Sequence, residues 1–89
     1  MIHQQVEIIN KLGLHARAAA KFVTTASAYG ADIYLARGDQ KVNGKSIMGV
    51  MMLAAAQGSL LELYVDGNDE EQAARALVEL INNRFDEEQ

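Results

Sequence analysis

The sequence predicts an α+β fold, an open-faced sandwich of order βαββαβα in which three helices cover one face of a four-stranded antiparallel sheet. Segments that alternate apolar and polar residues predict strands with one buried face. Segments with apolar residues at helical spacing lie between them. The length of 89 residues and an apolar share of 49% suit one compact core, so we expect a single domain over residues 1–89.

Four segments have the pattern of strands. In the first, Ile2, Val6 and Ile8 alternate with polar residues. The residues from Gly38 to Gln40 form a turn between the second and third strands, which makes these two a hairpin. The predicted strands are 2–8, 32–37, a short strand containing Val42, and 61–65, the last closing at Gly67.

Two helices are expected in the first two thirds of the chain. The first begins at Ala16 and has Gly30 as its C-cap. The second covers residues 47–55, with Ser46 capping its first turn and Gly58 ending it. The residues expected on their apolar stripes are Ala19, Phe22, Val23 and Ala26 in the first helix and Val50 and Leu53 in the second.

The third helix begins at Asn68 or Asp69, where Asn68 with Glu71 resembles a capping box. Beyond this helix, residues 86–89 are expected to form a solvated acidic tail. His3 is expected to be a surface residue on the polar face of the first strand, with no ligand partner nearby. The apolar stripe of the third helix comprises Ala73, Ala74, Leu77, Leu80 and Ile81.

Composition excludes several classes of function. The chain has no cysteine, and therefore no zinc cluster, thiol nucleophile or disulfide. A net charge of −4 with scattered Lys and Arg gives no basic stripe for nucleic acid. No segment approaches the roughly 20 apolar residues of a membrane span, and no leader is recognisable. We expect a monomeric cytoplasmic protein without metal or cofactor.

The stretch from Gly13 to Arg17 carries the most chemistry, because it places His15 at the start of a helix. The first N–H groups of a helix, here beginning with Ala16, have no intrahelical partner and attract anions. The Arg17 guanidinium can form bidentate hydrogen bonds with phosphoryl oxygens. Imidazole is itself a nucleophile at neutral pH, since its unperturbed pKa is about 6.5. These residues therefore predict that His15 accepts a phosphoryl group.

The alternative is that His15 only caps the helix or packs at the end of the sheet, as an isolated histidine at a helix start commonly does. Gly13 before it, Arg17 after it and the small alanines around it leave the ring accessible. A packed histidine does not need this access. The pair of His15 and Arg17, more than either residue alone, therefore favours the phosphoryl site.

The segment from Lys45 to Leu53 is more apolar than a helix on one face of a sheet requires. If its core-facing side packs on the sheet, Ile47, Met48 and Met51 are partly exposed and form a docking surface. The alternative, which we weigh equally, is that these residues fill an uneven core.

Ser46 is expected first to cap the second helix. A phosphate on Ser46 would still be tolerated at the helix N-terminus and would change the charge of the surface, which makes Ser46 a candidate regulatory site. Gly44-Lys45-Ser46 resembles the end of a nucleotide-binding P-loop. Such a loop needs a glycine five residues before its second glycine, and that position is Asp39, so we reject nucleotide binding.

Two motifs, Gly13-Leu14-His15-Ala16-Arg17 and Lys45-Ser46-Ile47-Met48, resemble the HPr family of histidine-containing phosphocarriers from the bacterial phosphoenolpyruvate-dependent phosphotransferase system. The resemblance covers nearly the whole chain. It implies that His15 is phosphorylated on Nδ1 by the first enzyme, phosphoenolpyruvate-protein phosphotransferase. It further implies that the group passes to a IIA-type acceptor, for sugar uptake or for nitrogen and carbon regulation.

The resemblance also implies roles for other residues. Arg17 stabilises the phosphoryl group, together with the backbone N–H of Ala16. Ser46 matches the serine that an ATP-dependent HPr kinase/phosphorylase modifies in many relatives, which lowers transfer through His15. The residues that fall where relatives contact their partners are Ala16, Arg17, Ala20, Ile47, Met48 and Met51.

The chain departs from the family motif at Ala18, where proline usually follows the arginine. Proline pre-sets the first helical turn and lacks an N–H, so Ala18 gives a less rigid turn with one more possible donor. The alanine-rich motif also resembles the nitrogen-related branch of the family, called NPr, whose acceptors are regulatory proteins rather than sugar permeases.

Two other functions stay open. A non-covalent regulatory or protein-binding module would act through the surface of Ile47, Met48 and Met51, and His15 would not be modified. An independent enzyme is the weaker alternative, because the sequence shows no second acid, base or metal ligand beside His15. We expect a carrier that is a substrate of its partners and not an enzyme.

Overall fold

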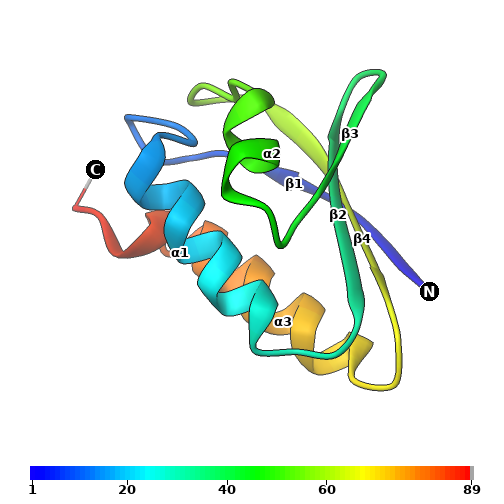
Figure 1. Cartoon of the computed structure of the whole chain (residues 1–89). Coiled ribbons are helices and arrows are strands. Elements are labelled where there is room, and N and C mark those ends of the chain that lie inside the picture. The colour runs from blue at the N-terminus through cyan, green and yellow to red at the C-terminus, as the bar shows by residue number, and fades with distance from the viewer. Residues whose placement is uncertain (89) are drawn as a thin grey trace.

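The computed structural model describes residues 1–88 and has the element order predicted from the sequence (Figure 1). Gln89, the last residue of the predicted acidic tail, lies outside the described residues. The elements are β1 (Ile2–Glu7), α1 (Ala16–Ser27), β2 (Asp32–Arg37), β3 (Gln40–Asn43), α2 (Ile47–Met52), β4 (Leu60–Asp66), α3 (Glu70–Asn82) and the short 3₁₀ helix η1 (Arg84–Asp86).

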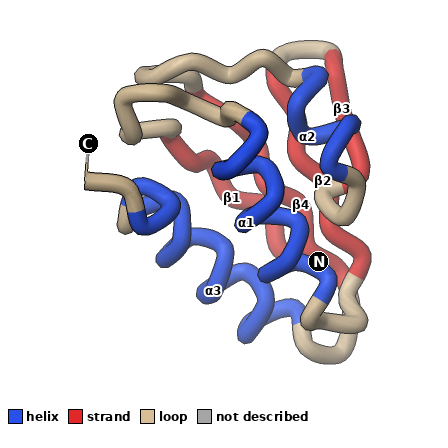
Figure 2. Tube along the Cα trace, turned by 60° about the vertical axis from the view of Figure 1, so that its left-hand side comes forward, coloured by secondary structure: helices blue, strands red, loops and turns tan. Residues whose placement is uncertain are grey.

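The four strands form one antiparallel sheet in the order β1-β4-β2-β3. The predicted hairpin is confirmed, since β2 pairs with β3. All three α-helices lie on one side of the sheet, with α1 between α2 and α3, and the other face is open (Figures 1 and 2). The open-faced α+β sandwich predicted from the sequence is therefore confirmed.

The central strand β4 shows why the sheet has one covered face. Leu61, Leu63 and Val65 are fully buried, whereas Glu62 and Tyr64 between them point to the open face. Side chains alternate sides along a strand, so this pattern fixes which face meets the helices. The same register aligns the buried residues of the neighbouring strands with them, pairing Leu61 with Val6, Leu63 with Leu35 and Val65 with Ile33.

The helices close the core over this face. Phe22 of α1, Val50 of α2 and Leu77 of α3 are fully buried, as the predicted stripes require. Burying side chains of this size stabilises the fold by about 1.5–3 kcal/mol each. α1 packs against both other helices (Figure 2), and this packing fixes the position of its first turn, which follows His15.

The second helix is shorter than predicted. It ends at Met52 instead of Ala55, because Ala54 has a left-handed φ of 49° that no helix continues through. The Arg37 guanidinium donates from Nη1 to the carbonyl oxygens of Leu53 at 3.0 Å and of Ala54 at 3.2 Å. These bonds satisfy carbonyls that the end of a helix leaves without partners.

The two glycines predicted to end helices do not do so. Gly58 lies in the turn before β4, where its N–H donates to the Ile8 carbonyl oxygen at 2.7 Å. The first helix has Ala28 as its C-cap, in the right-handed helical region. Gly30 follows this cap, and its N–H donates to Oδ2 of Asp69 at 2.9 Å.

The predicted capping box at the start of α3 is wrong. The N-cap is Asp69, and its side chain forms no cap hydrogen bond within its own helix. Its carboxylate instead accepts from the N–H groups of Gly30 and Ala31, both at 2.9 Å, and so ties the start of α3 to the start of β2. The tertiary contact has replaced the local one.

The predicted solvated tail is also wrong, at Glu87. Phe85 is fully buried, and Arg84, Phe85 and Asp86 all have left-handed φ angles, of 57°, 53° and 63°. This turn brings the chain back toward the start of α1 (Figure 1). Glu87 is partly buried there, with 15% of its side chain exposed, while Asp86 and Glu88 are exposed.

The open face of the sheet carries a polar and aromatic cluster. His3 stacks on Tyr64 with ring centroids 4.3 Å apart, and its Nε2 lies 2.5 Å from Oε1 of Glu62. The Lys41 ammonium lies over both Tyr64 and Tyr34. His3 is exposed as predicted, and the cross-strand register places Tyr64 beside it.

Gly13 offers a test of how the loop before α1 is held. It has a φ of +70°, and a Cβ at this position would lie 2.5 Å from the Ala55 carbonyl oxygen. We expect Gly13→Ala to lower the free energy of unfolding by about 2–4 kcal/mol, since it adds backbone strain and a clash. Urea denaturation followed by circular dichroism measures this.

Gly38→Ala is the matched control. Gly38 also has a positive φ, of 59°, but nothing lies within 4 Å of the added Cβ. Its free energy of unfolding should therefore fall only by the cost of the backbone strain, about 1 kcal/mol. Equal losses for the two variants would show that the contact with Ala55 is unimportant.

Candidate functional site

His15 is the N-cap residue of α1, with an extended backbone (φ −72°, ψ 176°). The loop that precedes it is fixed on both sides. The Leu14 N–H donates to the Ala55 carbonyl oxygen at 2.8 Å, and Nδ2 of Asn10 donates to the Gly13 carbonyl oxygen at 2.8 Å. Leu14 is itself buried, so His15 sits on a firmly held loop although its own side chain is 29% exposed.

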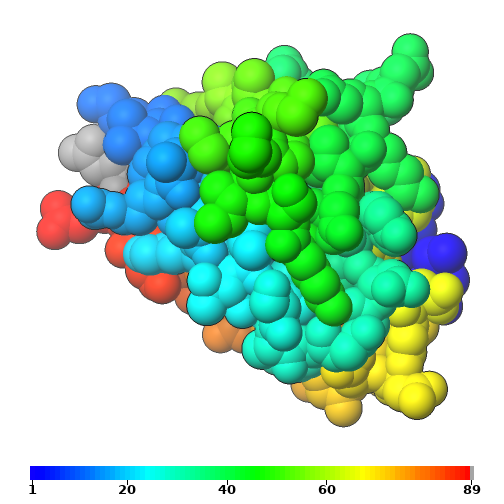
Figure 3. Space-filling view, in the orientation of Figure 1, coloured from blue at the N-terminus to red at the C-terminus, as the bar shows by residue number. Residues whose placement is uncertain are grey.

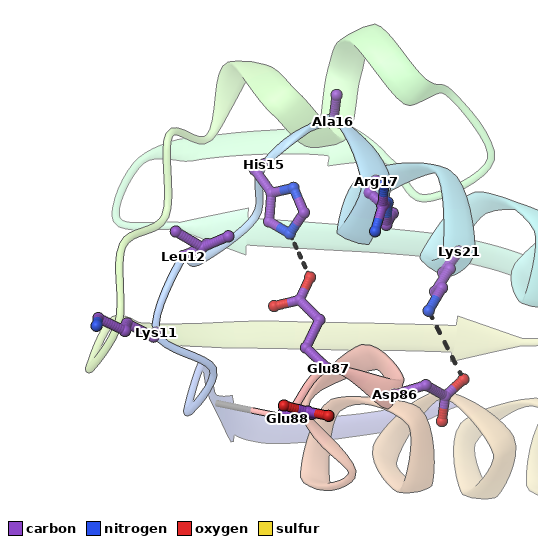
Figure 4. A pocket seen from close by; sticks show the side chains of 9 residues that line it. All are labelled: Lys11, Leu12, His15, Ala16, Arg17, Lys21, Asp86, Glu87 and Glu88. Atoms are coloured by element: carbon purple, nitrogen blue, oxygen red, sulfur yellow. Dashed lines mark hydrogen bonds and ion pairs between the residues drawn. The ribbon is translucent and has the colours of Figure 1, made fainter.

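Within residues 1–88, one of the two ring nitrogens of His15 is hydrogen-bonded to another side chain and the other is not. Its Nε2 is hydrogen-bonded to the Glu87 carboxylate (Figure 4). An ionised carboxylate only accepts, so Nε2 carries the hydrogen and Nδ1 keeps its lone pair. The open nitrogen lies on the side of the ring that faces Arg17 (Figure 4). The site therefore presents a nucleophilic nitrogen in the same cleft as a cation.

Glu87 is held by more than His15. Nδ2 of Asn10, which is fully buried, donates to Oε1 of Glu87 at 3.0 Å. Burial of Glu87 by itself would raise the pKa of its carboxyl group. The hydrogen bonds from His15 and Asn10, together with the nearby positive charge of Lys21, outweigh this effect, and the pKa of Glu87 is lowered.

The side chains around His15 form an open cleft, which we call the His15 cleft. The cationic side chains come from α1 and from the loop before it, and the acidic side chains come from the C-terminal segment (Figure 4). Lys21 already donates to the Phe85 carbonyl oxygen at 2.8 Å, whereas Arg17 is exposed and forms no ion pair within residues 1–88. The cleft is lined by Lys11, Leu12, His15, Ala16, Arg17, Lys21, Asp86, Glu87 and Glu88.

The first turn of α1 adds backbone donors. The first intrahelical bond runs from the Ala19 N–H to the His15 carbonyl oxygen, at 2.9 Å, so the N–H groups of Ala16 and Arg17 come before it. Such groups, with the helix dipole, favour an anion beside the ring. His15, Ala16 and Arg17, which were predicted to act together, therefore lie together in one cleft.

The predicted residues of α2 form a separate surface. Ile47, Met48 and Met51 are exposed by 45%, 76% and 41%, so the alternative that they fill the core is wrong. Met52, which the sequence analysis did not single out, is 64% exposed and extends the same surface. Figure 3 shows α2, in green, on the surface beside α1. We call Ile47, Met48, Met51 and Met52 the α2 surface.

Ser46 caps α2 as predicted. Its Oγ accepts from the Gly49 N–H at 3.1 Å, and the residue is partly exposed. Ala20 does not lie on the α2 surface. It lines a shallow groove with Arg17, Thr24 and Leu80, on the side of α1 that faces α3.

Asn10 and Glu87 are the residues that sequence reasoning missed. Nothing in the local pattern around Asn10 distinguishes it from a loop residue. For Glu87 a signal existed, because Phe85 is a large apolar residue in the segment interpreted as acidic and solvated. A buried Phe85 anchors that segment and brings the following carboxylate to His15.

No helix within residues 1–88 is long and apolar enough to cross a membrane. No group of three or more His, Cys, Asp or Glu side chains in this part of the chain is arranged to hold a metal ion.

The chain matches one family over most of its length. Residues 2–83 match the family model described as the PTS HPr component phosphorylation site. Among curated proteins, the chain is 58% identical over 87 residues to "Phosphocarrier protein HPr" of Neisseria meningitidis serogroup A, covering 98% of both proteins. Among solved structures, it resembles the HPr-C-His protein from Thermoanaerobacter tengcongensis, with a TM-score of 0.96, 49% identity and full coverage of both chains.

A further structure bears on assembly. The chain is similar to the HPr dimer from Thermoanaerobacter tengcongensis, with a TM-score of 0.79 and 49% identity, covering 98% of this chain and 100% of that one. That protein is described as a dimer, so the expectation that this chain is a monomer stays a prediction.

The lowered pKa of Glu87 has a consequence for stability. Glu87 is ionised in both states above the ordinary carboxyl pKa of about 4.3, and its full contribution is present there. As the pH falls, the unfolded chain is protonated first, and the contribution is lost as the pH passes the lowered folded value. We expect Glu87→Gln to cost about 1 kcal/mol of unfolding free energy at pH 7 and nothing at pH 2.

Urea titrations of both proteins at the two pH values measure this difference. A gap between wild type and variant that stayed the same at both pH values would contradict the ionic contribution of Glu87.

Proposed function

The chain belongs to the HPr family and is a phosphocarrier of the phosphotransferase system, and from this premise we propose that His15 is the residue that carries the phosphoryl group. The observation that supports this most is the position of His15. It is the N-cap of α1, its ring is partly exposed, its Nδ1 is open, and Arg17 lies in the same cleft.

The proposed step is a direct transfer to nitrogen. The lone pair of Nδ1 attacks phosphorus, an N–P bond forms, and the P–O bond of the donor breaks with its electron pair leaving on the donor. No general base is needed, since Nδ1 carries no hydrogen while Nε2 donates to Glu87. The product is a phosphohistidine, which the next partner attacks in the same way.

Arg17 and the start of α1 compensate the charge that arrives with the phosphoryl group. The Arg17 guanidinium is exposed and forms no ion pair within residues 1–88, so no existing contact has to break. The N–H of Ala16 is a backbone donor at the same end of the helix. We assign Arg17 and Ala16 to stabilisation of the phosphoryl oxygens.

Family membership implies interaction with phosphotransferase-system proteins. The donor in our proposal is phosphoenolpyruvate-protein phosphotransferase, and the acceptor is a protein of the IIA type. The α2 surface is the docking face, since its four apolar side chains are each exposed by more than 40% and a partner would cover them. Ala20, in the groove beside Arg17, extends the contact along α1.

Family membership also favours covalent carriage over the non-covalent binding module considered from the sequence. We extend the proposal to a monomeric, cytoplasmic carrier that consists of one domain over residues 1–89. As a carrier it is turned over by its partners and catalyses no reaction by itself.

Ser46 is the candidate regulatory site. Its hydroxyl is partly exposed while capping α2, so an HPr kinase/phosphorylase has access to it. A phosphate there is compatible with the helix N-terminus, but it places negative charge beside Ile47 and Met48. Phosphorylation of Ser46 is therefore expected to oppose docking of the donor.

The first test of the proposal is substitution of the acceptor. We expect His15→Ala to abolish labelling by phosphoenolpyruvate and the first enzyme, because His15 is the only imidazole among the described residues that line the cleft. Intact-mass analysis before and after brief acid treatment measures this, since phosphohistidine is lost in acid. The variant should remain folded, because His15 is at a helix end and outside the core. An acid-labile adduct on His15→Ala would place the site elsewhere.

The second test concerns the regulatory site. We expect Ser46→Asp to slow transfer from the first enzyme about tenfold, since its charge lies beside the docking face. Ser46→Ala is the control, as it loses the cap without adding charge and should lower stability by about 1 kcal/mol with little effect on transfer. Equal transfer rates for all three proteins, in stopped reactions, would remove Ser46 as a switch.

A further inference from the structure

We propose that Glu87 is a positioning residue for phosphoryl transfer. Its carboxylate, held by Asn10, keeps the hydrogen of the His15 ring on Nε2 and thereby leaves Nδ1 as the only nitrogen that can be phosphorylated. This inference rests on the proposed function of His15 as the acceptor.

The contacts of Glu87 leave little freedom to its carboxylate. Oε2 accepts from Nε2 of His15, and Oε1 accepts from Nδ2 of Asn10 at 3.0 Å. The second hydrogen of the same Asn10 nitrogen goes to the Gly13 carbonyl oxygen at 2.8 Å. One buried amide therefore joins the carboxylate to the loop that carries His15.

The position of Asn10 is energetically unfavourable in one respect. It is fully buried, and its Oδ1 has no hydrogen-bond partner within residues 1–88. Leaving such a buried acceptor unpaired is unfavourable. The opposite amide orientation would turn this oxygen toward the Glu87 carboxylate and the Gly13 carbonyl, which only repel it. The amide is thus oriented by its two donor bonds.

The backbone that delivers Glu87 is also costly. Arg84, Phe85 and Asp86 occupy the left-handed region, which is unfavourable for residues other than glycine. The complete burial of Phe85 and the bond from Lys21 to its carbonyl oxygen offset this strain. Glu87 therefore follows an anchored turn, and its place beside His15 is built into the fold.

The chemistry explains what the carboxylate does. Before transfer, a neutral ring donates its Nε2 hydrogen to the carboxylate. When Nδ1 forms the N–P bond and the donor's bond to phosphorus breaks, the ring keeps that hydrogen and becomes positively charged. The same hydrogen bond then joins a cation and an anion, which is stronger than the neutral bond. Glu87 thus stabilises the phosphorylated ring more than the free ring.

The same contact excludes the other nitrogen. A phosphoryl group on Nε2 would take the place of the hydrogen that Glu87 accepts. Its negative oxygens would then face the carboxylate, with only like charges opposed. Reaction at Nε2 therefore requires Glu87 to leave Asn10 as well as His15.

Regiochemistry with a small donor tests the proposal without any partner protein. Potassium phosphoramidate transfers a phosphoryl group to imidazole nitrogen and releases ammonia, and ³¹P NMR separates Nδ1 from Nε2 adducts. We expect the wild type to give the Nδ1 adduct. Glu87→Ala should raise the ratio of Nε2 to Nδ1 adducts at least about tenfold, as loss of a charge-assisted hydrogen bond predicts.

Glu88→Gln is the matched control, because Glu88 lines the same cleft and is exposed. It should behave as the wild type. Glu87→Gln keeps an acceptor for the Nε2 hydrogen but not the charge, so it should retain the Nδ1 preference better than Glu87→Ala. Identical adduct ratios in the wild type and Glu87→Ala would overturn the proposal.

A second measurement needs no phosphorylation. Long-range ¹H–¹⁵N NMR of the free protein reports which ring nitrogen of His15 carries the hydrogen. We expect the Nε2–H form in the wild type and a mixture of both forms in Glu87→Ala. A mixture already present in the wild type would overturn the role of Glu87. Failure of His15 to accept phosphate from the first enzyme would instead overturn the proposed function, and these readouts would still be obtained.

Discussion

The site depends on the close approach of two loops, the one before α1 and the one between α2 and β4. The backbone of Gly13 lies so near Ala55 that a single added carbon would meet its carbonyl oxygen at 2.5 Å. The Leu14 N–H then bonds to that same oxygen. This contact fixes Leu14, and therefore also fixes the position of the His15 imidazole and the start of α1 that follows it. Packing of the sheet and helices serves to hold these loops together.

Much of the fold was predictable because its pattern is local. The alternation of Leu61, Leu63 and Val65 identifies a strand wherever that strand pairs. The ends of the helices were predicted less well, because tertiary contacts decide them. Arg37, distant in sequence, satisfies the last carbonyls of α2, and Asp69 turns its carboxylate to another loop instead of capping α3. Capping rules based on neighbouring residues cannot predict hydrogen-bond partners that are distant in sequence.

The candidate site divides in the same way. His15, Ala16 and Arg17 are neighbours in sequence, and the chemistry of a helix start was enough to connect them. Glu87 reaches His15 across almost the whole length of the chain, through a turn in a rarely used region of the backbone. Asn10 joins this carboxylate to the loop before His15 through two hydrogen bonds of one amide nitrogen. Composition near residue 87 indicates charge and exposure, and only the buried ring of Phe85 reverses that expectation.

The uncovered face of the sheet has a spectroscopic consequence. The chain contains no tryptophan, and two of its three tyrosines, Tyr34 and Tyr64, lie on that face beneath the Lys41 ammonium. Both are on strands β2 and β4, whereas the His15 cleft is formed by the start of α1 and the C-terminal segment. Intrinsic fluorescence of this protein therefore reports mainly on the integrity of the sheet. Events at the imidazole are optically silent, and observing them directly requires a probe placed near the cleft.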